Sequence, residues 1–249
     1  MFTNSSILFP TDFSAYARYA MNYAVAMAKN YGGTLHIAHV LDTSVFVHGG
    51  EHGLWLTHAE AEKSIKCLRS RAEGRLDYLV QLAVTGGVNA VPHVVQGNPA
   101  RETVRLAREL NCGLIVIPTH GHGGLDRLVH GSTCEKVVRL SEVPVLTIRH
   151  PEREFLDSDD LTIHMKRVLF PTDFSAFSRP ALAYASSLCR EFGAGLVLFH
   201  CVSVPVVSPE FVPEAAATVA ATRVDEARQA LQTMADDVGD IETEIIVEE

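Results

Sequence analysis

The sequence predicts an α/β protein that contains two copies of one doubly wound domain, and two observations support this prediction. The first is a repeat: Ile7–Tyr16 (ILFPTDFSAY) returns as Val168–Phe177 (VLFPTDFSAF), 161 positions later, and the match continues through the next apolar run. A repeat of this length indicates duplicated domains. The second is the alternation of short apolar runs with longer segments of helical periodicity, which is typical of a parallel sheet covered by helices on both faces.

In the first copy, short apolar runs predict five strands, at residues 7–11, 35–41, 88–96, 114–119 and 144–149. The segments between them predict helices, the first capped by Ser14, the second spanning 57–84 and the last starting at Ser132. Asn98 followed by Pro99 is typical of a helix start, and this helix is expected to end near Cys112. Pro92 favours an edge position for the third strand, because proline cannot donate to a sheet ladder.

The second copy repeats only the first part of this pattern: strand, helix, strand, long helix and third strand. No fourth or fifth strand and no second glycine-rich loop follow. We therefore expect a complete domain at residues 1–149, an acidic linker at 150–166 and an incomplete domain at 167–249.

Composition excludes several classes of function. The formal net charge is −9, which argues against the basic surface that nucleic acids require. No uninterrupted apolar stretch of about 18 residues indicates a membrane span, and residues 1–6 do not resemble a secretory signal. The five cysteines are an odd number without metal-knuckle spacing. We expect a cytoplasmic protein with reduced thiols that binds neither nucleic acids nor membranes.

Asp12 follows the first predicted strand directly, within Pro10-Thr11-Asp12. Ligands of open parallel sheets bind at the carboxyl ends of the strands, where a carboxylate can accept hydrogen bonds from ribose hydroxyls or an adenine amine. The simpler interpretation is that Asp12 is a turn residue that bonds nearby backbone amides. The residues alone leave both interpretations open.

A glycine-rich segment links the fourth strand to the last helix: Thr119-His120-Gly121, nine residues, then Gly131-Ser132-Thr133. Glycines let a backbone approach phosphate oxygens, and the amides at a helix start attract anions. Ser132-Thr-Cys-Glu135 also has the form of a capping box, which needs no ligand. A phosphate site and a capped helix are both consistent with this segment.

Twelve histidines raise the question of a metal site. Two groups occur, at residues 48–58 and 120–130, but their spacings match no standard zinc motif, so we interpret them as histidines of surface loops. The sequence contains no nucleophile elbow and no Walker loop, and nothing marks a general base. We therefore predict no catalytic residue and no resident metal.

The motifs together resemble the universal stress protein family. They are the Pro-Thr-Asp-Phe-Ser start, the His39-Val40 strand end, the Gly97-Asn98-Pro99 turn and the Gly-x9-Gly-Ser loop before Pro-Val-Leu-Thr-Ile-Arg. The resemblance covers residues 5–149 and resumes near 166. It implies a Rossmann-like, adenine nucleotide alpha hydrolase-like fold with strand order 3-2-1-4-5. It also implies homodimers paired through the fifth strand, here Pro144–Arg149, and, in one branch of the family, an ATP site.

Carried over by position, the resemblance implies that Asp12 and Thr11 face the adenosine, that Val40 lines the adenine pocket and that the glycine loop holds the phosphates. Mg²⁺ is the companion ion expected with ATP. The implied site residues are Pro10, Thr11, Asp12, Val40, Ile117, Thr119, His120, Gly121, Gly131, Ser132 and Thr133. One residue departs from the pattern: Pro118 stands where the ATP-binding branch has its first glycine, and proline lacks the backbone N–H.

In the second copy Asp173 repeats Asp12, but no phosphate loop follows it, so we predict a single nucleotide site, in the first domain. The first strand of a family sheet is central, and here its second copy would become an exposed apolar edge. We therefore expect the chain to be a fragment of a longer tandem protein.

The hypothesis that follows is a cytoplasmic, ATP-binding stress-response module in which any hydrolysis is slow. The alternatives are a dimeric scaffold that binds no nucleotide, and an ATPase or nucleotidyl-transfer enzyme, for which the sequence offers no catalytic group.

Overall fold

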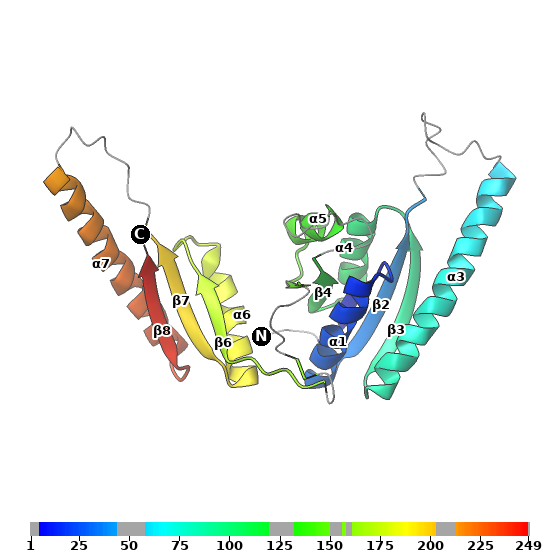
Figure 1. The fold of residues 1–249 in the computed structure, drawn as a ribbon, viewed down its shortest axis with the longest axis horizontal. Helices are drawn as coiled ribbons and strands as arrows, with labels where there is room; N and C mark the ends of the chain where they lie inside the picture. The colour runs from blue at the N-terminus through cyan, green and yellow to red at the C-terminus, as the bar shows by residue number, and fades with distance from the viewer. Residues whose placement is uncertain are drawn as a thin grey trace. The chain divides into compact units, whose positions relative to one another are not determined.

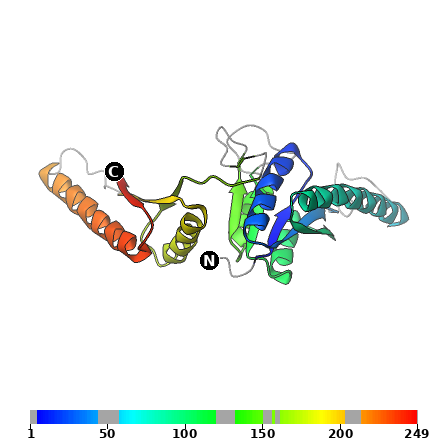
Figure 2. The ribbon, with the colours of Figure 1, turned by 90° about the horizontal axis from the view of Figure 1, so that it is seen from below.

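The computed structural model describes residues 5–43, 58–119, 132–149, 156–157, 161–202 and 213–248. The chain divides into two compact units, residues 2–163 and residues 164–249, which we call the N-unit and the C-unit (Figure 1). Figure 2 shows the same units from below. None of the helices in the described residues is long and apolar enough to cross a membrane.

The N-unit contains a five-stranded, fully parallel sheet of order β3-β2-β1-β4-β5, which confirms the predicted strand order. The strands are β1 (Ile7–Pro10), β2 (Thr34–Leu41), β3 (Asn89–Gln96), β4 (Leu114–Pro118) and β5 (Val145–Ile148). The helices are α1 (Ala15–Asn30), α3 (His58–Thr85), α4 (Pro99–Glu109) and α5 (Ser132–Leu140).

The core of the N-unit surrounds β1, the central strand. Ile7, Leu8 and Phe9 are at most 1% exposed. Side chains of a strand alternate between the two faces, so Leu8 points to the side opposite to its neighbours. On that side Leu8 packs with residues of α4 and α5, among them Leu106 and Val137. Right-handed crossovers place α1 and α3 over the other face.

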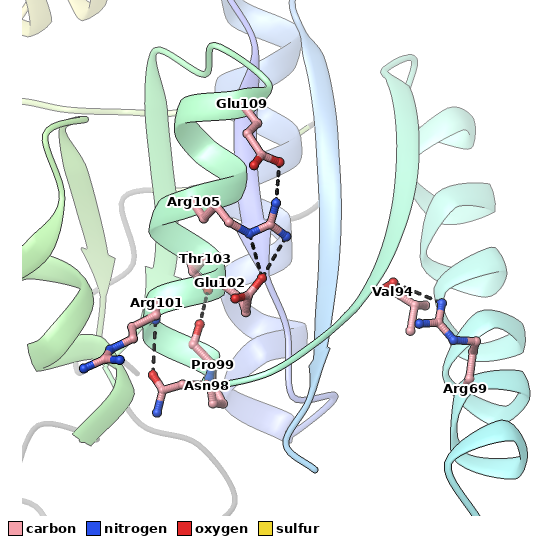
Figure 3. A network of polar contacts seen from close by, with 9 residues as sticks. All are labelled: Arg69, Val94, Asn98, Pro99, Arg101, Glu102, Thr103, Arg105 and Glu109. Atoms are coloured by element: carbon pink, nitrogen blue, oxygen red, sulfur yellow. Dashed lines mark hydrogen bonds and ion pairs between the residues drawn. The ribbon is translucent and has the colours of Figure 1, made fainter. Parts of the chain in front are cut away.

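The two edges of the N-unit sheet are β3 and β5. Pro92 lies within β3, and the edge position of this strand agrees with the prediction from the missing N–H of proline. Arg69 of α3 donates to the carbonyl of Val94 at 3.2 Å and so ties α3 to this edge strand (Figure 3). On α4, Arg105 forms ion pairs with Glu102 and Glu109, one turn away on either side (Figure 3).

Asn98 caps the N-terminus of α4, as its position before Pro99 predicts. Its side-chain oxygen accepts a hydrogen bond from the backbone N–H of Arg101 at 3.2 Å (Figure 3). We expect Asn98→Ala to lower the free energy of unfolding of the N-unit by about 1 kcal/mol, because an amide at the helix start loses its acceptor. Urea denaturation measures this change. Asn98→Asp should retain most of the stability, and an equal loss in both variants would contradict the capping role.

The C-unit contains three parallel strands in the order β6-β7-β8, which confirms the predicted truncated sheet. The strands are β6 (Arg167–Pro171), β7 (Gly195–Cys201) and β8 (Thr243–Glu248), and the helices are α6 (Ser178–Phe192) and α7 (Pro213–Val238). Within the described part of the chain, no strand pairs with the outer side of β6. Leu169 of this strand is 60% exposed, in agreement with the predicted apolar edge.

Candidate functional site

The strand order of the N-unit reverses between β1 and β4. The strands β2 and β3 follow each other on one side of β1, and β4 and β5 lie on the other side of β1. In open parallel sheets such a switch point forms a crevice at the carboxyl ends of the strands. Asp12 follows the end of β1, and Thr119 follows the end of β4. Two groups of predicted site residues therefore flank one switch point.

The other predicted residues lie at strand ends, at the start of α5 or outside the described residues. Pro10 ends β1, Ile117 lies near the end of β4, and Val40 is the penultimate residue of β2, the other neighbour of β1. Ser132 and Thr133 form the first turn of α5, with Ser132 exposed and Thr133 half-buried. The remaining predicted residues lie outside the described residues: His120, Gly121 and Gly131.

The turn between β1 and α1 is held by side chains that bond backbone amides. The Thr11 hydroxyl accepts from the Phe13 N–H at 3.0 Å, and a carboxylate oxygen of Asp12 accepts from the Ser14 N–H at 2.9 Å. The Ser14 hydroxyl accepts from the Ala17 N–H at 3.1 Å, which confirms the predicted helix cap. Asp12 thus has the local role that its sequence context suggested, and its role toward a ligand remains a prediction.

Phe13 adopts a backbone conformation that is unusual for its residue type, with φ of 63°. A bulky residue in this left-handed region is strained and needs support from its surroundings. Its ring stacks on His39 of β2, with the ring centroids 4.5 Å apart. On α3, the Arg75 guanidinium carbon lies 4.1 Å from the Phe13 ring centroid, and Arg75 donates to the Phe13 carbonyl at 3.3 Å.

His39 fixes the same turn from β2. Its Nδ1 lies 2.8 Å from the carbonyl oxygen of Thr11, and because a carbonyl only accepts, Nδ1 carries the proton. Burial lowers the pKa of His39, although the Thr11 bond and the Asp12 charge oppose that shift. The charge of Arg75 also lowers the pKa. His39 is therefore a neutral donor at neutral pH.

Two further histidines form a pair across the neighbouring strands β2 and β3. His36 of β2 and His93 of β3 lie 3.0 Å apart, between Nδ1 of the first and Nε2 of the second. Burial lowers the pKa of both, and in His93 the charge of His36 adds to the effect. A hydrogen bond across this pair needs an unprotonated nitrogen on one of the two rings, so the two rings cannot both be charged while the bond forms.

We expect the N-unit to lose stability as the pH falls below about 6.5, the ordinary histidine pKa. In that range the histidines of the unfolded chain bind more protons than those of the folded chain, because folding lowers their pKa values. The free energy of unfolding therefore rises with pH. Urea denaturation at pH 7.5 and pH 5.5 measures this slope. Replacing both His36 and His93 by glutamine should make it shallower and leave the part that His39 contributes, while His164→Gln should leave the slope as it is. A slope unchanged by the double substitution would contradict this assignment.

The C-unit repeats the bonds of the threonine, aspartate and histidine in this turn, but no side chain caps α6. The Thr172 hydroxyl accepts from the Phe174 N–H at 3.0 Å, and Asp173 accepts from the Ser175 N–H at 2.9 Å. Phe174 has φ of 60° and stacks on His200 at 4.4 Å, while His200 Nδ1 donates to the Thr172 carbonyl at 2.7 Å. Hydrogen bonds from Ser175 hold the pKa of Asp173 below its ordinary value.

An open hollow of about 420 Å³ lies at the carboxyl ends of β6 and β7. Asp173 and His200 line it, together with Pro171, Thr172, Phe199 and Cys201. The sequence prediction of a single nucleotide site, in the first domain, remains untested by this geometry. In the described part of the chain, no three His, Cys, Asp or Glu side chains are grouped so that they could hold a metal ion.

Three residues that shape the site were not predicted as part of it: Phe13, His39 and Arg75. The repeat held a signal for two of them, because Phe13 and His39 recur as Phe174 and His200 at the same offset of 161 residues. Arg75 lies on α3, beyond the part of the sequence in which the copies match, so the repeat gave no signal for it.

Comparison with known families decides which one this chain belongs to. The model of the Universal stress protein family matches it twice, over residues 3–149 and 164–249. The chain belongs to the universal stress protein family. This result confirms the resemblance read from the motifs, and both units are covered by the match.

Curated relatives match one domain of this universal stress protein. A universal stress protein of Methanocaldococcus jannaschii is 30% identical over 148 residues, which are 59% of this chain and 84% of the relative. A homologue of universal stress protein A from Coxiella burnetii is 28% identical over 142 residues, 57% of this chain and 94% of the relative.

Among solved structures, a universal stress protein from Archaeoglobus fulgidus matches the tandem arrangement. The TM-score is 0.65 at 20% identity. The match covers 98% of this chain and 77% of the Archaeoglobus fulgidus chain. A universal stress protein from Pseudomonas aeruginosa reaches a TM-score of 0.61 at 15% identity and covers 100% of this chain and 76% of its own. At these identities the likeness shows the fold.

Proposed function

We propose that this universal stress protein binds an adenine nucleotide, ATP, in the N-unit, and that the bound state regulates partner proteins in a stress response. The observation that carries the proposal is the position of Asp12 and Thr119, which follow β1 and β4 on either side of the switch point. This is where open parallel sheets bind their ligands. The resemblance to the ATP-binding branch of the family implies the same role for Asp12.

Each residue has a role that its chemistry allows. Asp12 accepts hydrogen bonds from the ribose hydroxyls or the adenine amine, and the half-buried Val40 packs against the base. Ser132 stands at the start of α5, where unpaired amides and the helix dipole favour phosphate oxygens. His120, Gly121 and Gly131 complete the phosphate loop in this proposal. Mg²⁺ bound with ATP would supply further neutralisation of the phosphate charge.

Pro118 affects the side of β4 that faces the proposed nucleotide. The amides of Ile115 and Thr119 donate to β5, to the carbonyls of Pro144 and Ile148. Backbone N–H directions alternate along a strand that is paired on both sides, so an amide at position 118 would point toward β1 and the crevice. Proline has no such N–H, and a hydrogen bond that glycine offers there is absent.

We therefore expect Pro118→Gly to raise the affinity for ATP by about threefold to tenfold, which corresponds to one hydrogen bond of ordinary net strength. Calorimetric titration of both proteins measures the change. Pro144→Gly, at the start of β5, is a matched control that should leave the affinity as it is. Equal or weaker binding by Pro118→Gly would contradict the idea that proline removes a ligand contact.

Titration of the full chain with ATP, followed by calorimetry, tests the proposed function itself. We expect one bound ATP per chain, with weaker binding of GTP, whose base lacks the exocyclic amine of adenine. Absence of heat at ATP concentrations far above the low-micromolar range would overturn the proposal. Phosphate release measured on the same samples should be slow or absent.

A second candidate function is that of a dimeric scaffold, and the edge strand β5 favours it. The strand is half-buried, and Val138 and Leu140 of the adjacent α5 are 51% and 52% exposed. We propose that two chains pair through β5, within the predicted Pro144–Arg149 segment. Sedimentation equilibrium tests this pairing, and Thr147→Lys should weaken it, because lysine on an edge strand opposes strand addition. A monomeric wild-type chain would overturn the scaffold.

A further inference from the structure

A second hollow lies in the N-unit, between α1 and α3, and has a volume of about 220 Å³. Arg18 and Met21 line it from α1, and Gly74, Arg75, Tyr78 and Leu79 line it from α3. Thr11 and Phe13 of the turn after β1 also line it, so the hollow adjoins the proposed nucleotide site at Thr11, while Asp12, Val40, Thr119 and Ser132 are not among its lining residues. Its volume is below that of pockets for drug-sized ligands, which begin at about 300 Å³.

The walls of this α1–α3 pocket are apolar, and its charged residues are cations. Met21 and Leu79 are buried, while the ring of Tyr78 is 63% exposed beside them. Arg18 and Arg75 are both exposed, and no acidic residue lines the pocket. Among the described residues, neither guanidinium has a carboxylate partner. Two positive charges therefore border an apolar hollow, and no carboxylate of the described residues forms an ion pair with either.

Arg75 is held in place before any ligand arrives. It donates one hydrogen bond to the Phe13 carbonyl at 3.3 Å and lies over the Phe13 ring, 4.1 Å from its centroid. A guanidinium has five N–H donors in a fixed plane, so most of them remain for a ligand. A carboxylate matches this planar fork with two parallel hydrogen bonds.

Gly74 lines the pocket from α3 and is exposed. It lies inside α3, where glycine is less favourable than any residue except proline. Its backbone is not left-handed, and a Cβ atom built on it would meet no atom within 4 Å. Neither backbone conformation nor close packing therefore requires glycine at this position. A larger side chain here would extend into the pocket that Gly74 lines.

We propose that the α1–α3 pocket binds a small aromatic carboxylate. The ring of the ligand lies against Met21 and Leu79 and beside the ring of Tyr78, where aromatic contacts add to apolar burial. Its carboxylate forms hydrogen bonds with Arg75 and an ion pair with Arg18. The missing side chain of Gly74 leaves room for the ring.

Titration of the full chain with phenylacetate, followed by calorimetry and amide NMR shifts, tests this proposal. We expect saturable binding of one phenylacetate per chain, with shifts centred on residues of α1 and α3. Phenylacetamide, which lacks the charge, and acetate, which lacks the ring, should each bind at least tenfold more weakly. Arg18→Met should weaken phenylacetate binding at least tenfold, whereas Arg71→Met, on α3 outside the pocket, should not.

Gly74→Leu should abolish binding by filling the hollow, and Gly74→Ala should weaken it less. Circular dichroism checks that these variants are folded. If Gly74→Leu does not fold, Arg18→Met decides the outcome, because it alters only an exposed side chain. Absence of phenylacetate binding at millimolar concentration would overturn the proposal. Equal binding of phenylacetamide, or unchanged binding by Arg18→Met, would overturn it as well.

Discussion

Replacing Asp12 by alanine should weaken ATP binding by at least tenfold, whereas Asp173→Ala should leave the affinity unchanged. Asp12 stands at the switch point between β1 and β4. A hydrogen bond from a ligand to a charged acceptor contributes about 1.5–3 kcal/mol, and about 1.4 kcal/mol corresponds to a factor of ten. Asp173 has the same neighbours in sequence, but β6 has no β4-like strand beside it among the described residues.

The two aspartates form a matched pair for this experiment. Each accepts a hydrogen bond from the serine two residues later, at 2.9 Å in both units. Alanine therefore removes this backbone contact from both turns, and circular dichroism of each variant checks that the two domains stay folded. Calorimetry of the wild type and of each variant measures that difference. Equal losses from Asp12→Ala and Asp173→Ala would refute the one-site proposal.

Phe9→Ala should have the largest effect on stability. Phe9 is fully buried on the central strand β1, which pairs with β2 on one side and β4 on the other. Truncating a phenylalanine in such a position costs about 3–5 kcal/mol, because the surrounding elements cannot close the cavity. Hydrogen exchange read by mass spectrometry should show faster exchange in β1, β2 and β4.

Phe170→Ala is the counterpart in the C-unit and provides the comparison. Phe170 is also buried, at 5% exposure, but β6 has a partner strand on one side only among the described residues. An edge strand can move to fill part of the cavity, so we expect a smaller loss of stability than for Phe9→Ala. A larger loss for Phe170→Ala would contradict this account of the two sheets.

Much of the fold followed from local sequence signals. The repeat predicted duplicated domains, Pro92 predicted an edge strand, and Asn98 with Pro99 predicted a helix start. Each of these residues restricts its own backbone or bonds a neighbour in sequence, so no tertiary information is needed. The strand order came from the family resemblance, since apolar runs alone do not indicate which strands pair.

The ends of elements were harder to predict. The third strand was expected from Val88, but β3 begins at Asn89, because the Val88 N–H closes α3 by donating to the Ala83 carbonyl at 3.0 Å. Likewise α4 was expected to reach Cys112 and ends at Glu109, since the Cys112 N–H donates back to Ala107 at 2.8 Å. Both apolar residues belong to helix-ending motifs.

The support behind Asp12 could not be predicted from local signals. Arg75 is 62 residues from Phe13, and helical periodicity does not indicate which ring a surface arginine will cover. The left-handed φ of Phe13 could not be predicted either, because this conformation is normally adopted by glycine or asparagine and is not expected for phenylalanine. Nor does a glycine inside a helix reveal whether the space beside it is filled or empty.

The edge of β6, which no strand covers in the part of the chain that the structure describes, affects how the purified protein has to be handled. Its N–H and C=O groups offer a template for any extended segment, including the same edge of another molecule. The single charge of this strand, on Arg167, is drawn toward Glu244 of β8 at 3.1 Å. Little on the strand itself therefore repels an incoming chain. Association of this kind grows with concentration, so dilute stocks, rather than low temperature alone, will keep the protein monodisperse.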